Sequence, residues 1–352
     1  MARFRRAANA AVALAALVAA WPCAGLSAPS APGPDVKAKD LLAKAVEADD
    51  HVSYTGTITT VVYGHDRADS TVVRIEHKAP HSWRIWYVAP ADAYGRMIVS
   101  NESQTYQYEA KAAKVYRNDW VESAPAIAEG LNVAQVEKNY TIGFGARSAV
   151  VGRPVRTISL VSKHTGAVGE RLWIDEKTDL PLQREKYHAD GTIGSKTSFD
   201  NLKMVKDLPP GLFSLAVPPG MTLEPGAAYG KSTKDINSLF SDLKFKFVNP
   251  KYLPYGFTLD KGSADKHEGV ETVQLIYTDG IQTFSLFENA TGQLPSFEQG
   301  SPKQIEVGDK AGEAAYVGGN ALISWNDGGL NLTMVGDLTP KELADIGASI
   351  KP

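Results

Sequence analysis

A succession of short segments rich in β-branched and aromatic residues constrains the fold more than any other feature of this chain. The segments recur about every ten residues, and turn-forming stretches such as "GHDRAD" and "APH" separate them. They are residues 53–63, 70–78, 82–88, 95–100, 103–109, 113–117, 153–163, 169–177, 180–188 and 194–204. Residues 119–139 interrupt the series, read as helix or loop, and could close over the sheet. This spacing predicts an antiparallel meander rather than a βαβ fold.

The segment "SWRIWYV" (82–88) carries apolar side chains on both faces of the expected strand. One face has Trp83, Ile85 and Tyr87, and the other has Trp86 and Val88 beside an arginine. A sheet with one face in water would not expose Trp86 and Val88, so we expect both faces to be covered.

Helices are scarce in the first 230 residues, and the clearest one is predicted over residues 36–50, where Leu42 and Ala45 fall on one face. So few helices cannot cover a long two-faced sheet completely. Two architectures meet this shortage: a half-closed barrel whose concave face holds a helix plug and an apolar ligand, or a plain β-sandwich with ordinary packing of the two tryptophans. The residues alone leave both open.

The second half of the chain reads as a smaller β-rich domain over residues 236–352. A proline- and glycine-containing stretch, residues 224–235, is predicted to link it to a first domain over residues 36–223. From residue 231 onward there are 11 Lys and Arg against 16 Asp and Glu, which predicts an acidic surface.

Two turn motifs and one helix-capping motif predict the elements of this second domain. Asp279-Gly280 lies between two alternating runs and predicts a hairpin, and residues 320–337 predict another. A final helix is expected to begin with Thr339 as its N-cap, followed by Pro340 and by Glu342 as the capping-box partner.

The N-terminus has the pattern of an export signal, predicted over residues 1–27. A basic "MARFRR" precedes an apolar stretch too short to span a bilayer comfortably, and "CAGLSA" offers small residues for cleavage. Cys23, the only cysteine, lies in this segment and follows Pro22, which does not suit lipid attachment. We therefore expect a soluble periplasmic product without disulfides or a thiol nucleophile.

Several kinds of chemistry are not supported by the sequence. The net charge of −3 and the lack of a basic stripe argue against a nucleic-acid partner. "GKST" (230–233) would need a glycine where Pro225 stands to form a phosphate loop. His77 and His81 flank a proline between strands, so they read as polar surface residues rather than metal ligands. The sequence predicts no catalytic residue, no metal site and no cofactor, and hence a protein that is not an enzyme.

The strand series, the N-terminal helix, "WIDEKTDLPLQREKYHADGT" and "LPPGLFSLAVPPG" resemble the lipoprotein-carrier (LolA-like) superfamily of unclosed barrels. The second half adds "YLPYGF", "YTDGIQTFSLFE" and "VGDLTPKELADIGASI". Together these motifs resemble the RseB/MucB family over nearly all of the expected mature chain. The resemblance implies a mostly antiparallel α+β fold: an unclosed LolA-like half-barrel with a helix plug, joined to a smaller β-rich domain with a C-terminal helix.

The same resemblance implies a function. RseB/MucB-like proteins are periplasmic negative regulators of the envelope-stress (sigma-E) response, which bind the periplasmic segment of an RseA/MucA-like membrane anti-sigma factor and shield it from proteolysis. The resemblance also implies that a lipid or lipoprotein signal weakens this binding, and it is compatible with a homo-oligomer. The alternative is a stand-alone periplasmic carrier of lipid or lipoprotein, which would retain acylated cargo instead of an anti-sigma factor.

Two sets of residues are the candidates for these roles. The lipid-cavity candidates are the two faces of the 82–88 strand, Trp83, Ile85 and Tyr87 or Trp86 and Val88. The partner-binding candidates lie on the predicted hairpin of the second domain and are Tyr277, Asp279, Gly280, Phe284 and Phe287.

Overall fold

The computed structural model describes residues 35–64, 67–118, 127–188, 190–225, 243, 245–267, 270–291, 302–317 and 319–351. The predicted signal peptide and all of the predicted linker after residue 225 lie outside these ranges. None of the helices in the described part of the chain has the length and apolar character of a membrane span.

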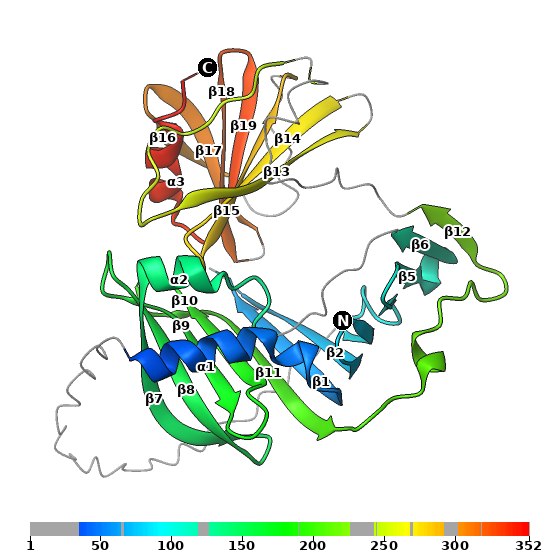
Figure 1. Cartoon of the computed structure of the whole chain (residues 1–352). Helices are drawn as coiled ribbons and strands as arrows, with labels where there is room; N and C mark the ends of the chain where they lie inside the picture. The colour runs from blue at the N-terminus through cyan, green and yellow to red at the C-terminus, as the bar shows by residue number, and fades with distance from the viewer. Residues whose placement is uncertain are drawn as a thin grey trace, which may run out of the picture. The chain divides into compact units, whose positions relative to one another are not determined.

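A sheet of 12 strands contains most of the first half of the chain (Figure 1). Its strands are β1 (Tyr54–Tyr63), β2 (Ala68–Lys78), β3 (Ser82–Ala89), β4 (Met97–Ser100), β5 (Thr105–Glu109), β6 (Lys114–Asn118), β7 (Tyr140–Val150), β8 (Arg153–Ser162), β9 (Val168–Asp175), β10 (Pro181–Tyr187), β11 (Ile193–Met204) and β12 (Thr222–Pro225). All ten predicted segments form strands, so the β-rich prediction is confirmed.

The strand order is β12-β6-β5-β4-β3-β2-β1-β11-β10-β9-β8-β7. Two antiparallel meanders therefore meet where β1 pairs with β11, and β12 adds to β6 in parallel. Among the described strands, β12 and β7 stand at opposite edges and do not pair with each other, so the sheet stays unclosed. This is the predicted half-barrel.

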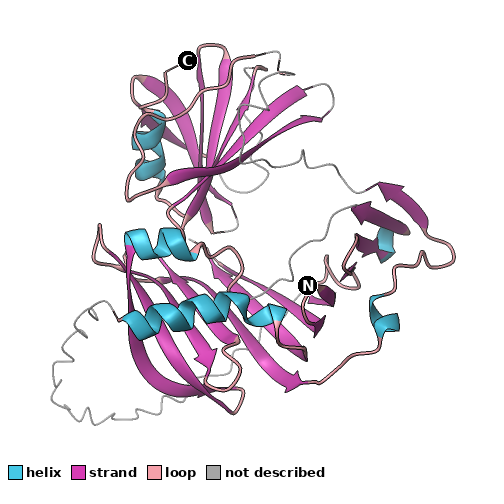
Figure 2. Ribbon diagram, viewed as in Figure 1, coloured by secondary structure: helices cyan, strands magenta, loops and turns pink. Residues whose placement is uncertain are grey.

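Two helices cover one face of this sheet, as Figure 2 shows for strands β7 to β11. They are α1 (Val36–Glu47), which continues as the short 3-10 helix η1 (Ala48–Asp50), and α2 (Val133–Asn139). Asp35 caps α1 by accepting a hydrogen bond from the backbone N–H of Lys37 at 2.9 Å. Buried side chains of α1, Leu42 among them, pack on inward residues of β7, β8 and β9 such as Leu160. The predicted helix plug is confirmed.

Two short 3-10 helices complete the first half: η2 (Ala110–Ala112) and η3 (Pro210–Phe213). Phe213 of η3 packs with Val99, Tyr106 and Val115 in a small apolar cluster beneath strands β4 to β6. This outer arm of the sheet therefore has a core of its own, separate from the one under the helix plug.

The second half forms an antiparallel sheet of seven strands in the order β13-β14-β15-β19-β18-β17-β16. The strands are β13 (Thr258–His267), β14 (Val270–Thr278), β15 (Thr283–Asn289), β16 (Lys303–Val307), β17 (Lys310–Val317), β18 (Asn320–Asp327) and β19 (Leu330–Gly336). The helix α3 (Pro340–Gly347) packs on it through Leu343 and Ile346. Thr339 and Glu342 form the predicted capping box, and both predicted hairpins are present.

Candidate functional site

The hairpin between β14 and β15 ends in a four-residue turn, residues 279–282, which we call the Asp279 turn. The hairpin prediction is confirmed, but the loop is longer than the two residues Asp279-Gly280, because Thr278 pairs with Thr283. The Asp279 carboxylate accepts the backbone N–H groups of Ile281 at 2.9 Å and of Gln282 at 2.8 Å. These bonds fix the turn in one conformation.

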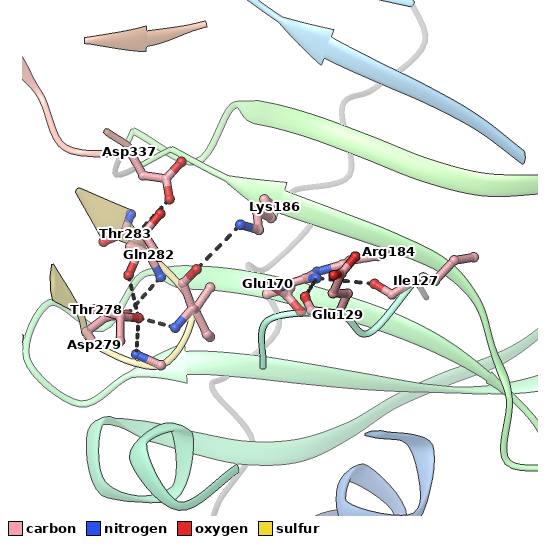
Figure 3. Close-up of polar contacts among 12 residues, drawn as sticks. Ile127, Glu129, Glu170, Arg184, Lys186, Thr278, Asp279, Gln282, Thr283 and Asp337 are labelled. Atoms are coloured by element: carbon pink, nitrogen blue, oxygen red, sulfur yellow. Dashed lines mark hydrogen bonds and ion pairs between the residues drawn. The ribbon is translucent and has the colours of Figure 1, made fainter. Parts of the chain in front are cut away.

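The Asp279 turn is bonded to helix α2 and to the start of β7 (Figure 3 shows the turn). Asn139 donates its amide N–H to the Asp279 carbonyl at 2.8 Å, and the Tyr140 hydroxyl donates to the Asp279 carboxylate. Gln135 donates to the Thr278 carbonyl and, at 2.8 Å, to the Thr258 hydroxyl. The smaller sheet thus contacts the half-barrel through a polar network that is buried around Asp279 and exposed at Thr258.

Burial sets the electrostatics of this network. It raises the pKa of Asp279, although the Tyr140 hydroxyl and two backbone N–H groups act in the opposite direction. Burial, reinforced by the neighbouring Asp279 carboxylate, also raises the pKa of Tyr140 well above its ordinary value. The tyrosine therefore stays a hydrogen-bond donor over the physiological pH range.

Gly280 lies against α2 with no room for a side chain. Its φ is +106°, and a Cβ placed there would come within 2.7 Å of the Val136 backbone nitrogen. A glycine is required at this position both by the backbone conformation and by the close approach of the helix.

Ile281, the next residue of the turn, is buried in the apolar cluster under the helix plug. It packs with the same group as Leu131 and Val136 of the half-barrel. The Lys186 ammonium group on β10 donates a long hydrogen bond of 3.4 Å to the Ile281 carbonyl (Figure 3). An isoleucine of the smaller sheet is therefore part of the half-barrel core.

Arg184 lies two residues before Lys186 on β10 and bonds to a second segment, the one that contains Ile127 and Glu129 (Figure 3). Its guanidinium group donates to the carbonyls of Ile127 at 3.2 Å and Glu129 at 2.7 Å. It also donates to the fully buried Glu170 carboxylate at 2.7 Å. Sequence reasoning missed these residues, although two cations at alternate positions of β10, facing an apolar core, were a usable signal.

Three adjoining cavities have volumes of about 90, 210 and 500 Å³, and residues of the Asp279 turn line the two smaller ones. His188 and Asp337 line all three. The largest is flanked by three exposed apolar side chains, Tyr63, Ile193 and Tyr316, whose exposed fractions are 38%, 36% and 46%. We call these cavities together the junction groove. Exposed aromatic and aliphatic side chains around a hollow are typical of a protein-binding surface.

The lipid-cavity candidates divide between the two faces of β3. Trp83 and Ile85 are buried in the core of the half-barrel, and Tyr87 packs against it. On the other face the Arg84 guanidinium lies 4.1 Å from the centre of the Trp86 ring, and Val88 is 43% exposed. The expectation that a second layer covers this face is therefore wrong for Val88. The binding of a lipid by either face stays a prediction.

The partner-binding candidates have contacts inside the chain. Tyr277 and Phe284 are buried and stack at 4.8 Å in the core of the smaller sheet, while Asp279 and Gly280 form the buried turn. Phe287 is half-buried. Their role in partner binding stays a prediction.

The prediction that His77 is a surface residue is wrong. The ring is fully buried, lies 5.0 Å from the Tyr54 ring, and has its Nδ1 atom 3.0 Å from the Val52 carbonyl oxygen. Strand alternation placed it on the inward face beside Ile75, which the nearby proline and polar residues hid. His81 is exposed, as predicted.

Fold and site together define an open β half-barrel, plugged by helices and bonded to a smaller antiparallel sheet. The MucB/RseB N-terminal domain matches residues 37–216, more than half of the chain. This chain belongs to the MucB/RseB family. No curated protein matches it.

Three solved structures are similar over both sheets. The Pseudomonas aeruginosa MucA/MucB complex has 18% identity and a TM-score of 0.63, covering 90% of this chain and 99% of that one. MucB in complex with MucA(peri) has 17% identity and a TM-score of 0.61, covering 90% and 98%. MucB alone has 17% identity and a TM-score of 0.55, covering 92% and 100%. At these identities the likeness shows a shared fold.

Proposed function

We propose that this protein is a periplasmic negative regulator of the envelope-stress response, which binds the periplasmic segment of a membrane anti-sigma factor and shields it from proteolysis. The observation that carries the proposal is membership of the MucB/RseB family together with a fold shared, over 90% of the chain, with MucB in its complex with MucA. Regulation by binding needs a surface and no catalytic group.

The junction groove is the surface that we propose for the anti-sigma segment. Tyr63, Ile193 and Tyr316 are exposed there, and an extended segment in the groove would contact strands of both sheets at once. Tyrosines are frequent among the residues that dominate binding energy at protein interfaces. Of the buried hairpin candidates, Asp279 and Gly280 would contribute indirectly, because they hold the two sheets together next to the groove.

We expect Tyr316→Ala to weaken binding of the anti-sigma segment by about tenfold or more, because truncating a central aromatic contact costs over about 1.4 kcal/mol. Isothermal titration with the periplasmic segment of the anti-sigma factor encoded beside this gene measures the change. Tyr252→Ala is the matched control, because Tyr252 is a comparably exposed tyrosine that does not line the cavities of the groove. Equal affinities of both variants and the natural protein would place the binding surface elsewhere, and capture of acylated cargo alone would favour a carrier.

We also propose that the protein senses a lipid signal, and the apolar inward face of β3 supports this. We expect tryptophan fluorescence to change on titration with an acylated peptide, because an acyl chain gains about 0.8 kcal/mol for each methylene that it buries. The change should disappear in Trp83→Phe, whose ring faces the interior, and persist in Trp86→Phe, whose ring lies under Arg84. No response in the natural protein, or loss only in Trp86→Phe, would contradict this assignment.

A further inference from the structure

The cavity of about 210 Å³ in the junction groove is rich in hydrogen-bond donors. Its lining includes Lys186, His188, Ser195, Gln282 and Asn320. The side-chain amides of Gln282 and Asn320 and the Ser195 hydroxyl form no hydrogen bond with another described residue. All three side chains are only partly buried, so their donors can bind water or the acceptor oxygens of a ligand.

The ammonium group of Lys186 is a positive charge in this cavity without a carboxylate of the described residues within ion-pair distance. Its ammonium group forms no ion pair with a described carboxylate, and its one hydrogen bond, to the Ile281 carbonyl, is 3.4 Å long. The neighbouring cation Arg184, by contrast, is paired with Glu170. A half-buried, unpaired ammonium group in a cavity favours an anionic ligand.

Glycines bring the backbone close to this cavity. Gly169, Gly194 and Gly319 all line it. A Cβ on Gly194 would come within 2.9 Å of the His188 ring, and one on Gly319 within 2.8 Å of Val62. Side chains at these positions would crowd the cavity walls, so the glycines keep room for a compact ligand.

We propose that this cavity is a binding site for an oxyanion, a phosphate or carboxylate group, held by Lys186 and the surrounding donors. Among the described residues of the lining, Asp337 is the one carboxylate, and its Oδ2 atom already accepts the Thr283 backbone N–H at 2.9 Å. The anion therefore sits on the Lys186 side. Because the lining comes from both sheets, its binding bridges the half-barrel and the smaller sheet. The site does not depend on the anti-sigma proposal.

The test is a thermal-unfolding titration of the mature protein with inorganic phosphate, against sodium chloride at the same ionic strength. Phosphate should raise the melting temperature beyond the salt control, because a ligand that binds only the folded state stabilises it. Lys186→Gln should abolish this increment, and Lys196→Gln, a lysine on the neighbouring strand outside the cavity lining, should keep it. Asp337→Asn should tighten phosphate binding several-fold by removing the one negative charge in the lining.

Dodecyl phosphate, used below its micelle-forming concentration, separates the two sources of the oxyanion. Binding about tenfold tighter than inorganic phosphate, and still sensitive to Lys186→Gln, would identify the head group of an amphiphile, since two buried methylenes already supply that factor. Equal binding of the two would identify a free anion. No increment over sodium chloride, or an increment that Lys186→Gln leaves unchanged, would overturn the proposal even if the anti-sigma segment binds normally.

Discussion

Arg184→Met is expected to lower the free energy of unfolding by about 3–5 kcal/mol, because it leaves the Glu170 carboxylate buried without its cation. Glu170 is fully buried, and within the described part of the chain only one of its two carboxylate oxygens has a hydrogen-bond partner even in the intact pair. The substitution also frees the carbonyls of Ile127 and Glu129. Urea unfolding followed by circular dichroism measures the loss.

Two variants control this experiment. Arg74→Met removes an exposed arginine from β2 of the same sheet and should change stability by less than about 0.5 kcal/mol. The double variant Glu170→Leu/Arg184→Met should recover much of the loss, since it removes the stranded charge as well. A single variant as stable as the natural protein would contradict a structural role for the pair.

Glu288→Gln is expected to remove a pH dependence of stability that the natural protein shows between about pH 4.5 and pH 8. Glu288 is fully buried in the smaller sheet, where one oxygen accepts the Val248 backbone N–H at 2.8 Å and the other has no hydrogen-bond partner among the described residues. Burial raises the pKa of this carboxyl from 4.5 to about 8.

The direction of the effect follows from proton binding. Over this interval the folded state binds more protons than the unfolded state, so the free energy of unfolding falls as the pH rises. The stability from the neutral carboxyl is complete below pH 4.5 and lost once the pH passes about 8. A shift of this size corresponds to roughly 5 kcal/mol.

Urea unfolding at about pH 5, 6.5 and 9 tests this. Glu288→Gln should gain stability over the natural protein at the highest pH, and the gain should vanish at the lowest. Glu306→Gln, an exposed glutamate on β16, is the control and should follow the natural protein at every pH. Parallel pH profiles for the natural protein and Glu288→Gln would show that Glu288 ionises normally.

The sequence predicted most strands, the first and last helices and both hairpins, because these depend on local patterns. Strand β7 was missed because Gly143 and Gly145 interrupt it and residues 146–149 are exposed, so no alternation marks it. Strand β12 was missed because four residues that pair in parallel with a distant strand carry no local signal. Helix α2 was only partly foreseen within residues 119–139.

The candidate site was harder to predict, because it depends on which segments meet. Asp279-Gly280 predicted a turn. The sequence did not show that this turn would be buried against α2, because the residues of α2 lie more than 100 positions earlier in the chain. Strand alternation predicted that another layer of the protein would cover Trp86. In the structure the guanidinium group of Arg84, on the same face, covers the ring. The hydrogen bonds from Arg184 to backbone carbonyls could not be predicted, because every residue type has the same carbonyl group.

The hydrogen bonds from β10 to backbone carbonyls affect which substitutions this molecule tolerates. Arg184 donates hydrogen bonds to the backbone carbonyls of Ile127 and Glu129, and Lys186 donates one to the carbonyl of Ile281. Neither cation bonds to the side chains of these three residues. Every amino acid supplies the same carbonyl oxygen. The attachment of both segments to β10 therefore does not depend on the side chains at these three positions. Packing restricts the buried Ile127 and Ile281 instead, and the exposed Glu129 is the position most open to substitution. One strand can thus keep both segments attached while an exposed position such as Glu129 diversifies.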